Sequence, residues 1–218
     1  MAGTSKEDTG VIQKGFLKVD YNSLCGKLTE YRIDPELREA KKTVLPFVTG
    51  LRFSSLLIYA MRKILKGTKL KANWGVIIHN KDIRCSSECD IIVHKDDSDL
   101  AWDGQDDFDG PVMDFHFVPK SKVKAVVSCK ASCVTQINQG MKDDVVKLRD
   151  YVSRVWLFAE CCEPGKVVEL RKKAIASGYE KLLYLYLLRP NGVGCYYDER
   201  VWFKFAESLK ELAREGEG

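Results

Sequence analysis

Apolar residues recur with two different periods along the chain, and these periods indicate where strands and helices lie. Short apolar runs rich in β-branched residues, such as WGVIIH at 74–79, predict strands. Apolar residues that recur every three or four positions predict helices, most clearly at 134–152, where the stripe is Ile137, Met141, Val145, Leu148 and Val152. The strands are predicted at 74–79, 88–94, 113–118, 123–130, 152–160 and 181–189. The other helices are predicted at 52–66, at 163–178, at 202–216 and from Pro35, with Asp34 as its N-cap.

The order of these elements is helices, then three or four strands, then alternating helices and strands. A meander of antiparallel strands followed by crossover connections makes a mixed sheet covered by helices. We therefore expect an α/β fold, and the 218 residues suit a single domain spanning 1–218. Residues 1–15 are polar and are expected to be flexible. Residues 95–111 hold seven aspartates and predict a long acidic loop without the spacing of a calcium-binding loop.

Composition sets only broad limits on function. The net charge of +4 permits a nucleic-acid partner without demanding one. The first residues lack the apolar core of a signal peptide and no apolar run could span a bilayer, so we expect a cytoplasmic protein with reduced thiols and no membrane contact. The C-x3-C spacings of Cys85/Cys89 and Cys129/Cys133 leave structural zinc open, but small buried thiols are the favoured interpretation.

Two residues with catalytic potential lie on different predicted strands. Asp90 opens DIIVH, and Lys130 ends the apolar strand VKAVVSCK at 123–130. Side chains alternate along a strand, so Ser128 and Lys130 are expected to share a polar face while Cys129 points into a core. Hydrolysis of a phosphodiester needs carboxylates that hold Mg²⁺ and a cation that acts on water or phosphate. A strand-end lysine that simply reaches water remains the alternative.

These residues resemble a known superfamily. An aspartate, a long insertion and a strand ending in E-x-K form the signature of the PD-(D/E)XK nucleases, and the resemblance covers roughly residues 85–160. Here the strand ends Ser128-Cys129-Lys130, which is similar to the S-x-K variant of restriction endonucleases that cut sites with a CCGG core. The resemblance implies an αβββαβ core and a Mg²⁺-dependent site with Asp90, Lys130 and Ser128. It also implies that the missing carboxylate comes from the next helix, fourteen positions after the lysine, at Asp144.

Helix geometry supports Asp144 independently. On a wheel with Met141 at zero, Asp144 falls about 60° away, at the edge of the buried stripe, and Asp143 about 160° away. Asp144 can therefore point toward the strand of Lys130. The open alternative is a boundary aspartate that pairs with Lys147.

Other acidic residues are weaker candidates for the metal site. Glu88 shares a sheet face with Asp90 and is either a second metal ligand or a strand-edge charge. The superfamily often adds a helix glutamate, for which Glu36 and Glu39 are loose candidates. Cys89 stands where the superfamily motif has proline.

The segment after Lys130 is the candidate for reading DNA bases. Related enzymes place arginines there, but this segment holds none, so the resemblance does not transfer a recognition sequence. Amide side chains can pair with adenine in the major groove. Polar residues that merely cap and solvate a helix start are the alternative. The candidate DNA-binding residues are Ser132, Thr135, Gln136, Asn138 and Gln139.

The sequence thus predicts a Mg²⁺-dependent DNA endonuclease that acts on double-stranded DNA as a type II-like restriction enzyme. Such an enzyme is expected to be a homodimer, because two centres cut the two strands of a symmetric site. The alternatives are a DNA-repair nuclease, a degraded nuclease fold that only binds nucleic acid, and a protein-interaction domain without DNA contact.

Overall fold

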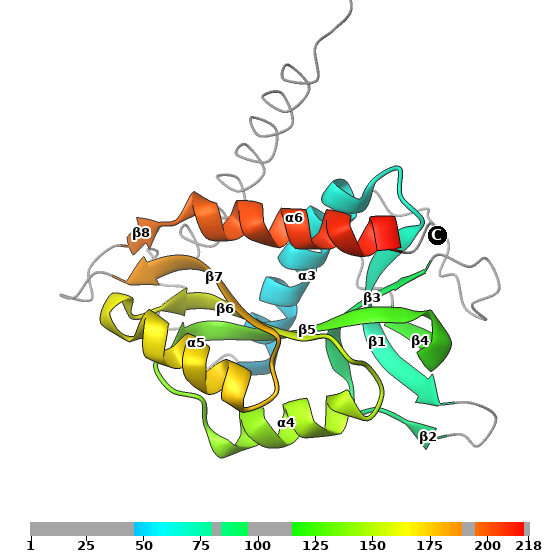
Figure 1. The fold of residues 1–218 in the computed structure, drawn as a ribbon, viewed down its shortest axis with the longest axis horizontal. Helices are drawn as coiled ribbons and strands as arrows, with labels where there is room; N and C mark the ends of the chain where they lie inside the picture. Colours follow the sequence, from blue (N-terminus) through cyan, green and yellow to red (C-terminus); the bar gives the residue numbers. More distant parts are fainter. Residues whose placement is uncertain (1–45, 80–83, 96–114, 189–194, 216–218) are drawn as a thin grey trace, which may run out of the picture.

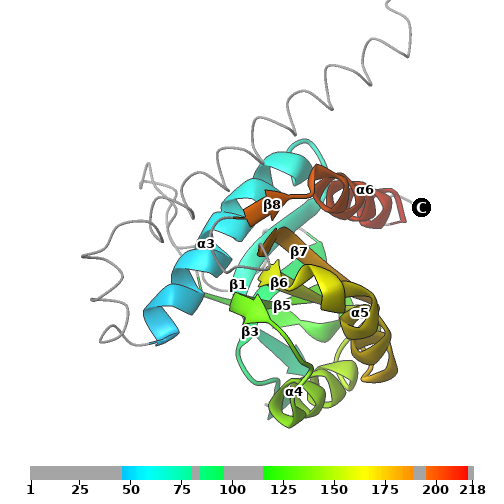
Figure 2. The ribbon, with the colours of Figure 1, turned by 90° about the vertical axis from the view of Figure 1, so that its left-hand side faces the viewer.

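The computed structural model describes residues 46–79, 84–95, 115–188 and 195–215, and these residues form a mixed sheet between two helical layers (Figures 1 and 2). Helices α3 (Pro46–Leu65) and α6 (Glu199–Glu215) lie against each other on one side of the sheet. Helices α4 (Gln139–Arg149) and α5 (Val167–Ala176) lie on the other side. The expected α/β fold, with a mixed sheet flanked by helices, is therefore confirmed.

The sheet has the predicted change from antiparallel to parallel pairing. Strands β1, β3 and β5 pair antiparallel, and β5, β6 and β7 pair parallel through crossovers that contain α4 and α5. Strand β4 pairs parallel with β1, away from the main strand order β2-β1-β3-β5-β6-β7-β8. The bounds are β1 Leu70–His79, β2 Arg84–Cys85, β3 Cys89–Lys95, β4 Phe115–Pro119, β5 Val123–Val134, β6 Val155–Cys162, β7 Lys181–Leu188 and β8 Cys195–Tyr197. The short strands β2 and β8 were not predicted.

Several element boundaries differ from the prediction. Helix α3 begins at Pro46 rather than at residue 52, and it ends before Gly67, whose φ of 84° suits a helix end. Strand β5 continues to Val134, so α4 starts only at Gln139. The predicted helix 163–178 is divided into the 3₁₀ turn η3 (Pro164–Lys166) and α5. The flexible segment 1–15, the helix from Pro35 and nearly all of the acidic loop 95–111 lie outside the described residues.

Aromatic side chains join the sheet to α3 and α6. Phe158 of β6 lies between Phe53 of α3 and Phe205 of α6, with ring centroids 6.2 and 4.9 Å away. Trp156 of the same strand packs edge-on against Phe205. All four rings are fully buried, which is worth roughly 1.5–3 kcal/mol for each large apolar side chain. This core fixes β6, which pairs with β5, the strand that carries Lys130.

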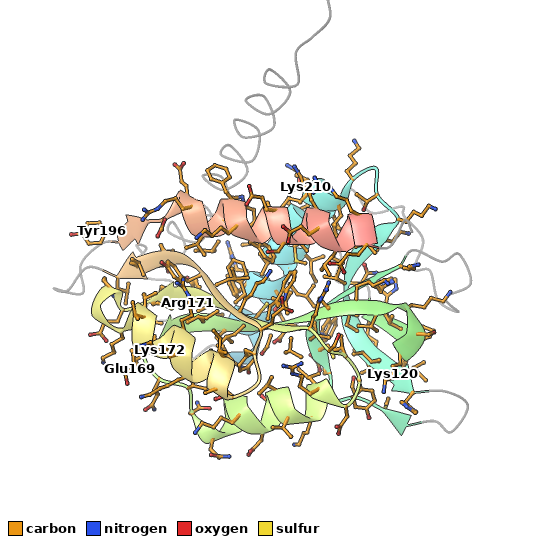
Figure 3. The ribbon with its side chains drawn as sticks, viewed as in Figure 1. Lys120, Glu169, Arg171, Lys172, Tyr196 and Lys210 are labelled. Atoms are coloured by element: carbon orange, nitrogen blue, oxygen red, sulfur yellow. The ribbon has the colours of Figure 1, made fainter. Side chains whose placement is uncertain are left out.

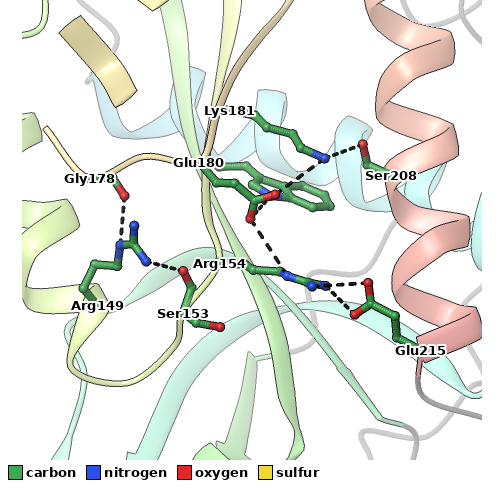
Figure 4. A network of polar contacts seen from close by, with 9 residues as sticks. Arg149, Ser153, Arg154, Gly178, Glu180, Lys181, Ser208 and Glu215 are labelled. Atoms are coloured by element: carbon green, nitrogen blue, oxygen red, sulfur yellow. Dashed lines mark hydrogen bonds and ion pairs between the residues drawn. The ribbon is translucent and has the colours of Figure 1, made fainter. Parts of the chain in front are cut away.

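Charged side chains are distributed around the outside of this core. Glu169 and Lys172 of α5 lie on the outer surface (Figure 3). Arg154, just before β6, forms ion pairs with Glu215 at the end of α6 and with Glu180, at 2.7 and 4.0 Å (Figure 4). Such partly exposed pairs contribute about 1 kcal/mol or less. No helix among the described residues is long and apolar enough to cross a membrane.

The β1–β4 pairing yields the first testable prediction. A Cβ atom on Gly75 would stand 1.9 Å from the carbonyl oxygen of His116, so the backbone of β4 would have to move. We expect Gly75→Ala to lower the free energy of unfolding by about 1–3 kcal/mol, as other overpacked sites do. Urea unfolding followed by circular dichroism measures the change.

Gly50→Ala is the matched control for this substitution. Gly50 lies within α3, and a Cβ there would meet nothing within 4 Å, so alanine should leave stability unchanged or raise it. Equal stabilities of Gly75→Ala and the wild type would contradict the close approach of β4.

Candidate active site

Asp90 is tied to the backbone of the neighbouring strand. It is the second residue of β3, and its Oδ2 accepts a hydrogen bond of 2.7 Å from the amide of Cys129 in β5. The β3–β5 ladder runs up to the pair Ile91 and Val127, so this side chain takes an amide just beyond the last backbone pair. The carboxylate therefore has a fixed place beside the strand that carries Lys130.

Four residues predicted for the site interact electrostatically, namely Asp90, Glu88, Lys130 and Asp144. Burial raises the pKa of Asp90 above its usual value, and the nearby carboxylates of Glu88 and Asp144 raise it further. The Cys129 amide and the Lys130 charge act in the opposite direction. A carboxylate that is partly buried beside two others is a place where a cation would be stabilised.

Lys130 and Asp144 line one cavity of about 410 Å³. Lys130 comes from β5 and Asp144 from the middle of α4, so the cavity lies between the sheet and this helix. Asp143 is not among the lining residues, and its Oδ1 accepts a 2.8 Å hydrogen bond from Gln139 Nε2. The two adjacent aspartates thus face different surroundings. Within the described part of the chain, Asp144 makes no ion pair with Lys147, which was the alternative for this residue.

The environment of Ser128 corrects an expectation. Lys130 was expected on a polar strand face together with Ser128, but Ser128 is only 5% exposed, because this side of the sheet is covered. Tyr179, just before β7, is its polar neighbour, and Ser128 opposes the rise in the pKa of the Tyr179 phenol. The Tyr179 hydroxyl itself donates to the carbonyl oxygen of Met141 in α4, at 2.9 Å.

Glu88 lies at the outer margin of this cluster. It is exposed, and its Oε1 accepts a 2.7 Å hydrogen bond from the indole nitrogen of Trp74 in β1. The bond orients the Glu88 carboxylate, whose negative charge raises the pKa of Asp90. Sequence reasoning gave no role to Trp74 or Tyr179, because neither belongs to a motif and their partners are distant in the sequence.

The predicted DNA-reading residues divide into two groups. Ser132, Thr135, Gln136 and Asn138 line the cavity with Lys130, whereas Gln139 does not and instead bonds Asp143. Asn138 is also the N-cap of α4, because its Oδ1 accepts a 2.9 Å hydrogen bond from the amide of Met141. For Asn138, the capping role that was the alternative is therefore present in the structure.

The described residues contain no group of three or more His, Cys, Asp or Glu side chains placed to hold a metal ion. Two carboxylates are compatible with Mg²⁺, which often takes one or two from the protein and completes its shell with water and substrate phosphate.

Burial raises the pKa of Cys89 to about 11 and that of Cys129 well above its usual value, so both behave as buried thiols. Glu36 and Glu39 lie outside the described residues.

Comparison with known proteins identifies the fold. No protein family and no curated protein matches the sequence. Among solved structures, NucC of P. aeruginosa ATCC27853 in its cAAA-bound form superposes with a TM-score of 0.60 at 11% identity, covering 97% of this chain and 93% of that chain. NucC of E. coli MS115-1 in its cAAA-bound form gives a TM-score of 0.57 at 10% identity, with the same coverage of both chains.

These similarities confirm the predicted core and nothing finer. The chain shares the α/β fold of NucC, with a mixed sheet flanked by helices, as predicted. At such low identity the comparison concerns the fold alone, and it gives no support to the S-x-K restriction branch in particular. The site residues must therefore be judged by their geometry.

The environment of Asp90 yields a prediction about stability. The pKa of Asp90 is higher in the folded state than in the unfolded state. The contribution of Asp90 to stability is therefore fully present below about pH 4, where an ordinary aspartate is protonated, and it is lost as the pH rises through the folded-state pKa. Asp90→Asn cannot ionise, and we expect it to be more stable than the wild type near pH 7 without metal and to lose this advantage in acid.

Thermal unfolding in EDTA across this pH range measures the effect. Asp143→Asn is the control, because Asp143 is exposed and should give little difference at either pH. An Asp90→Asn variant that is less stable than the wild type at neutral pH would show that the carboxylate is a structural acceptor rather than a strained charge.

Proposed function

We propose that this protein is a Mg²⁺-dependent DNA endonuclease of the PD-(D/E)XK type, with Asp90, Lys130 and Asp144 at its active centre. The observation that carries the proposal is that α4 places Asp144 in the same cavity as Lys130, within electrostatic reach of Asp90. Strands β3 and β5 and helix α4 thus contribute two carboxylates and one lysine. The nuclease fold shared with NucC supports the same reaction class.

Each residue has a distinct task in this proposal. Asp90 and Asp144 hold the ion, and Glu88, oriented by Trp74, is the candidate for an additional ligand. A bound Mg²⁺ would activate water and stabilise charge on the scissile phosphate. Lys130 acts on the attacking water or neutralises developing charge on the phosphate. Because burial raises the pKa of Asp90, its affinity for a metal ion should strengthen as the pH rises through that pKa.

Ser128 has a supporting task in the same centre. Its hydroxyl cannot supply the negative charge of the glutamate in the E-x-K motif, and it lies buried beside Tyr179. The second charge therefore comes from α4, through Asp144. This exchange of a strand acid for a helix acid is the feature shared with the S-x-K restriction enzymes.

Double-stranded DNA is the proposed substrate, and a homodimer is the proposed active form. Two copies of the centre are needed to cut both strands of a symmetric site, as a type II-like restriction enzyme does. Ser132, Thr135 and Gln136 line the cavity beside Lys130 and are the proposed contacts to DNA. A repair nuclease would use the same centre, so the chemistry is proposed independently of the biological role.

Cleavage of supercoiled plasmid in Mg²⁺ tests the proposed activity. Asp90→Asn should be at least about a hundredfold slower than the wild type, equal to roughly 2.7 kcal/mol of transition-state stabilisation, because it removes charge at the metal. Lys130→Ala should abolish cleavage while DNA binding in Ca²⁺ remains nearly intact, because Lys130 serves chemistry rather than folding. Wild-type cleavage rates in either variant would remove that residue from the mechanism.

The buried Ser128 favours one competing function, a degraded nuclease fold that binds DNA without cutting it. The same plasmid assay separates the two functions. A wild-type protein that shifts DNA in a salt-sensitive manner but never cleaves it with Mg²⁺ or Mn²⁺ would establish the competing function.

The adjacent aspartates provide a matched pair of variants. Asp144→Asn should cripple cleavage and raise the Mg²⁺ concentration needed, because it removes one of two carboxylates. Asp143→Asn should be nearly neutral, since Asp143 is engaged with Gln139 outside the cavity. Cleavage rates measured over a range of Mg²⁺ concentrations check both expectations, and equal behaviour of the two variants would refute a carboxylate donated by α4.

A further inference from the structure

One face of α4 rests on the turn that connects α5 to β7. Met141, Val145 and Arg149 are spaced four residues apart and therefore share a face of the helix. The carbonyl oxygen of Met141 accepts the Tyr179 hydroxyl at 2.9 Å, and Arg149 Nε donates to the carbonyl oxygen of Gly178 at 2.9 Å (Figure 4). Between these two bonds, the methyl groups of Val145 would lie 3.6 and 3.7 Å from a Cβ placed on Gly178.

The turn itself is held firmly in place. Gly178 has a φ of 108°, a conformation that glycine adopts readily at the end of a helix such as α5. The amide of Tyr179 donates to the carbonyl oxygen of Ala174 at 3.1 Å, and the amide of Glu180 donates to that of Val155 at 2.8 Å. The turn is therefore a fixed support for α4.

Tyr179 is suited to act as a permanent hydrogen-bond donor. Its side chain is 1% exposed, and burial raises the pKa of its phenol to about 12, so the hydroxyl keeps its proton at neutral pH. The charges of Asp144 and Asp90 add to this rise, which places the phenol close to both proposed metal ligands.

We propose that Tyr179 is a positioning residue of the active centre, because its hydroxyl fixes the rotation of α4 that points Asp144 rather than Asp143 toward Lys130. This inference rests on the function proposed above. Successive residues are about 100° apart around a helix, so anchoring the face of Met141 and Val145 determines where Asp144 points. The Tyr179 bond acts at Met141, three residues before Asp144, whereas the Arg149 bond acts at the last residue of α4.

Tyr179→Phe tests the inference, because it removes the hydroxyl and keeps the ring. Tyr184→Phe is the matched control: Tyr184 is a buried tyrosine of β7 whose hydroxyl bonds Asp198, at 3.3 Å, instead of α4. The primary readout is Mn²⁺ binding to the intact protein, followed by electron paramagnetic resonance. The second is the Mg²⁺ concentration that gives half-maximal plasmid cleavage, with the KM for DNA measured alongside.

We expect Tyr179→Phe to weaken Mn²⁺ binding and to raise the Mg²⁺ requirement by about threefold to tenfold, the change that one buried hydrogen bond typically carries. The KM for DNA should not change. Tyr184→Phe should match the wild type in metal binding, even if both variants unfold at lower temperature. In an Asp144→Asn background, Tyr179→Phe should have no further effect on metal binding, because the two residues act through one contact.

Wild-type metal binding in Tyr179→Phe, or an equal loss in Tyr184→Phe, would overturn the positioning role and leave the proposed nuclease function intact. A full effect of Tyr179→Phe in the Asp144→Asn background would also overturn it, because Tyr179 would then act through another group. A wild-type protein that neither binds Mn²⁺ nor cleaves DNA would overturn the proposed function and this inference together.

Discussion

The hydrogen bond from the Cys129 amide to the Asp90 carboxylate is the contact around which the candidate centre is arranged. It joins β3 to β5 one step beyond their last backbone pair, and it places Asp90 beside the residue that follows Cys129, Lys130. The aromatic core of β6 with α3 and α6 supports β5 from one side. Helix α4 covers the other side and brings Asp144 to the cavity, so the centre depends on both helical layers.

This arrangement places one acidic group, Asp90, where burial opposes its charge. Asp90 has a raised pKa because it is desolvated, and the negative charges of Glu88 and Asp144 raise this pKa further. The Cys129 amide and Lys130 offset part of this cost, and a divalent cation would offset more. A protein that retains such a strained group gains no stability from it, which is the physical argument for a functional role.

The sequence predicted those parts of the structure that depend on local periodicity. The strands that carry Asp90 and Lys130 and the buried stripe of α4 were predicted because alternating and helical patterns are visible in a single segment. The helical wheel also separated Asp144 from Asp143, and the structure places only Asp144 at the cavity. The assignment of function to these residues stays a prediction.

Long-range contacts could not be predicted in this way. The start of α4 was placed too early, because apolar residues 134 and 137 extend the helical stripe although β5 still runs to Val134 and Asn138 caps the helix. Ser128 was expected on a polar face, because the sequence of β5 alone does not show that another element covers this residue. Tyr179 gave no signal, because its partner is the backbone carbonyl of Met141, and a backbone partner leaves no trace in side-chain patterns.

The location of the bound metal tests the central claim most directly. Crystals of the protein soaked in Mn²⁺ would reveal the ion by its anomalous scattering. We predict a peak coordinated by carboxylate oxygens of both Asp90 and Asp144, with Lys130 beside it and Asp143 uninvolved. A peak that contacts Asp90 and Glu88 but not Asp144, or a fully occupied site elsewhere on the molecule, would contradict the centre described here.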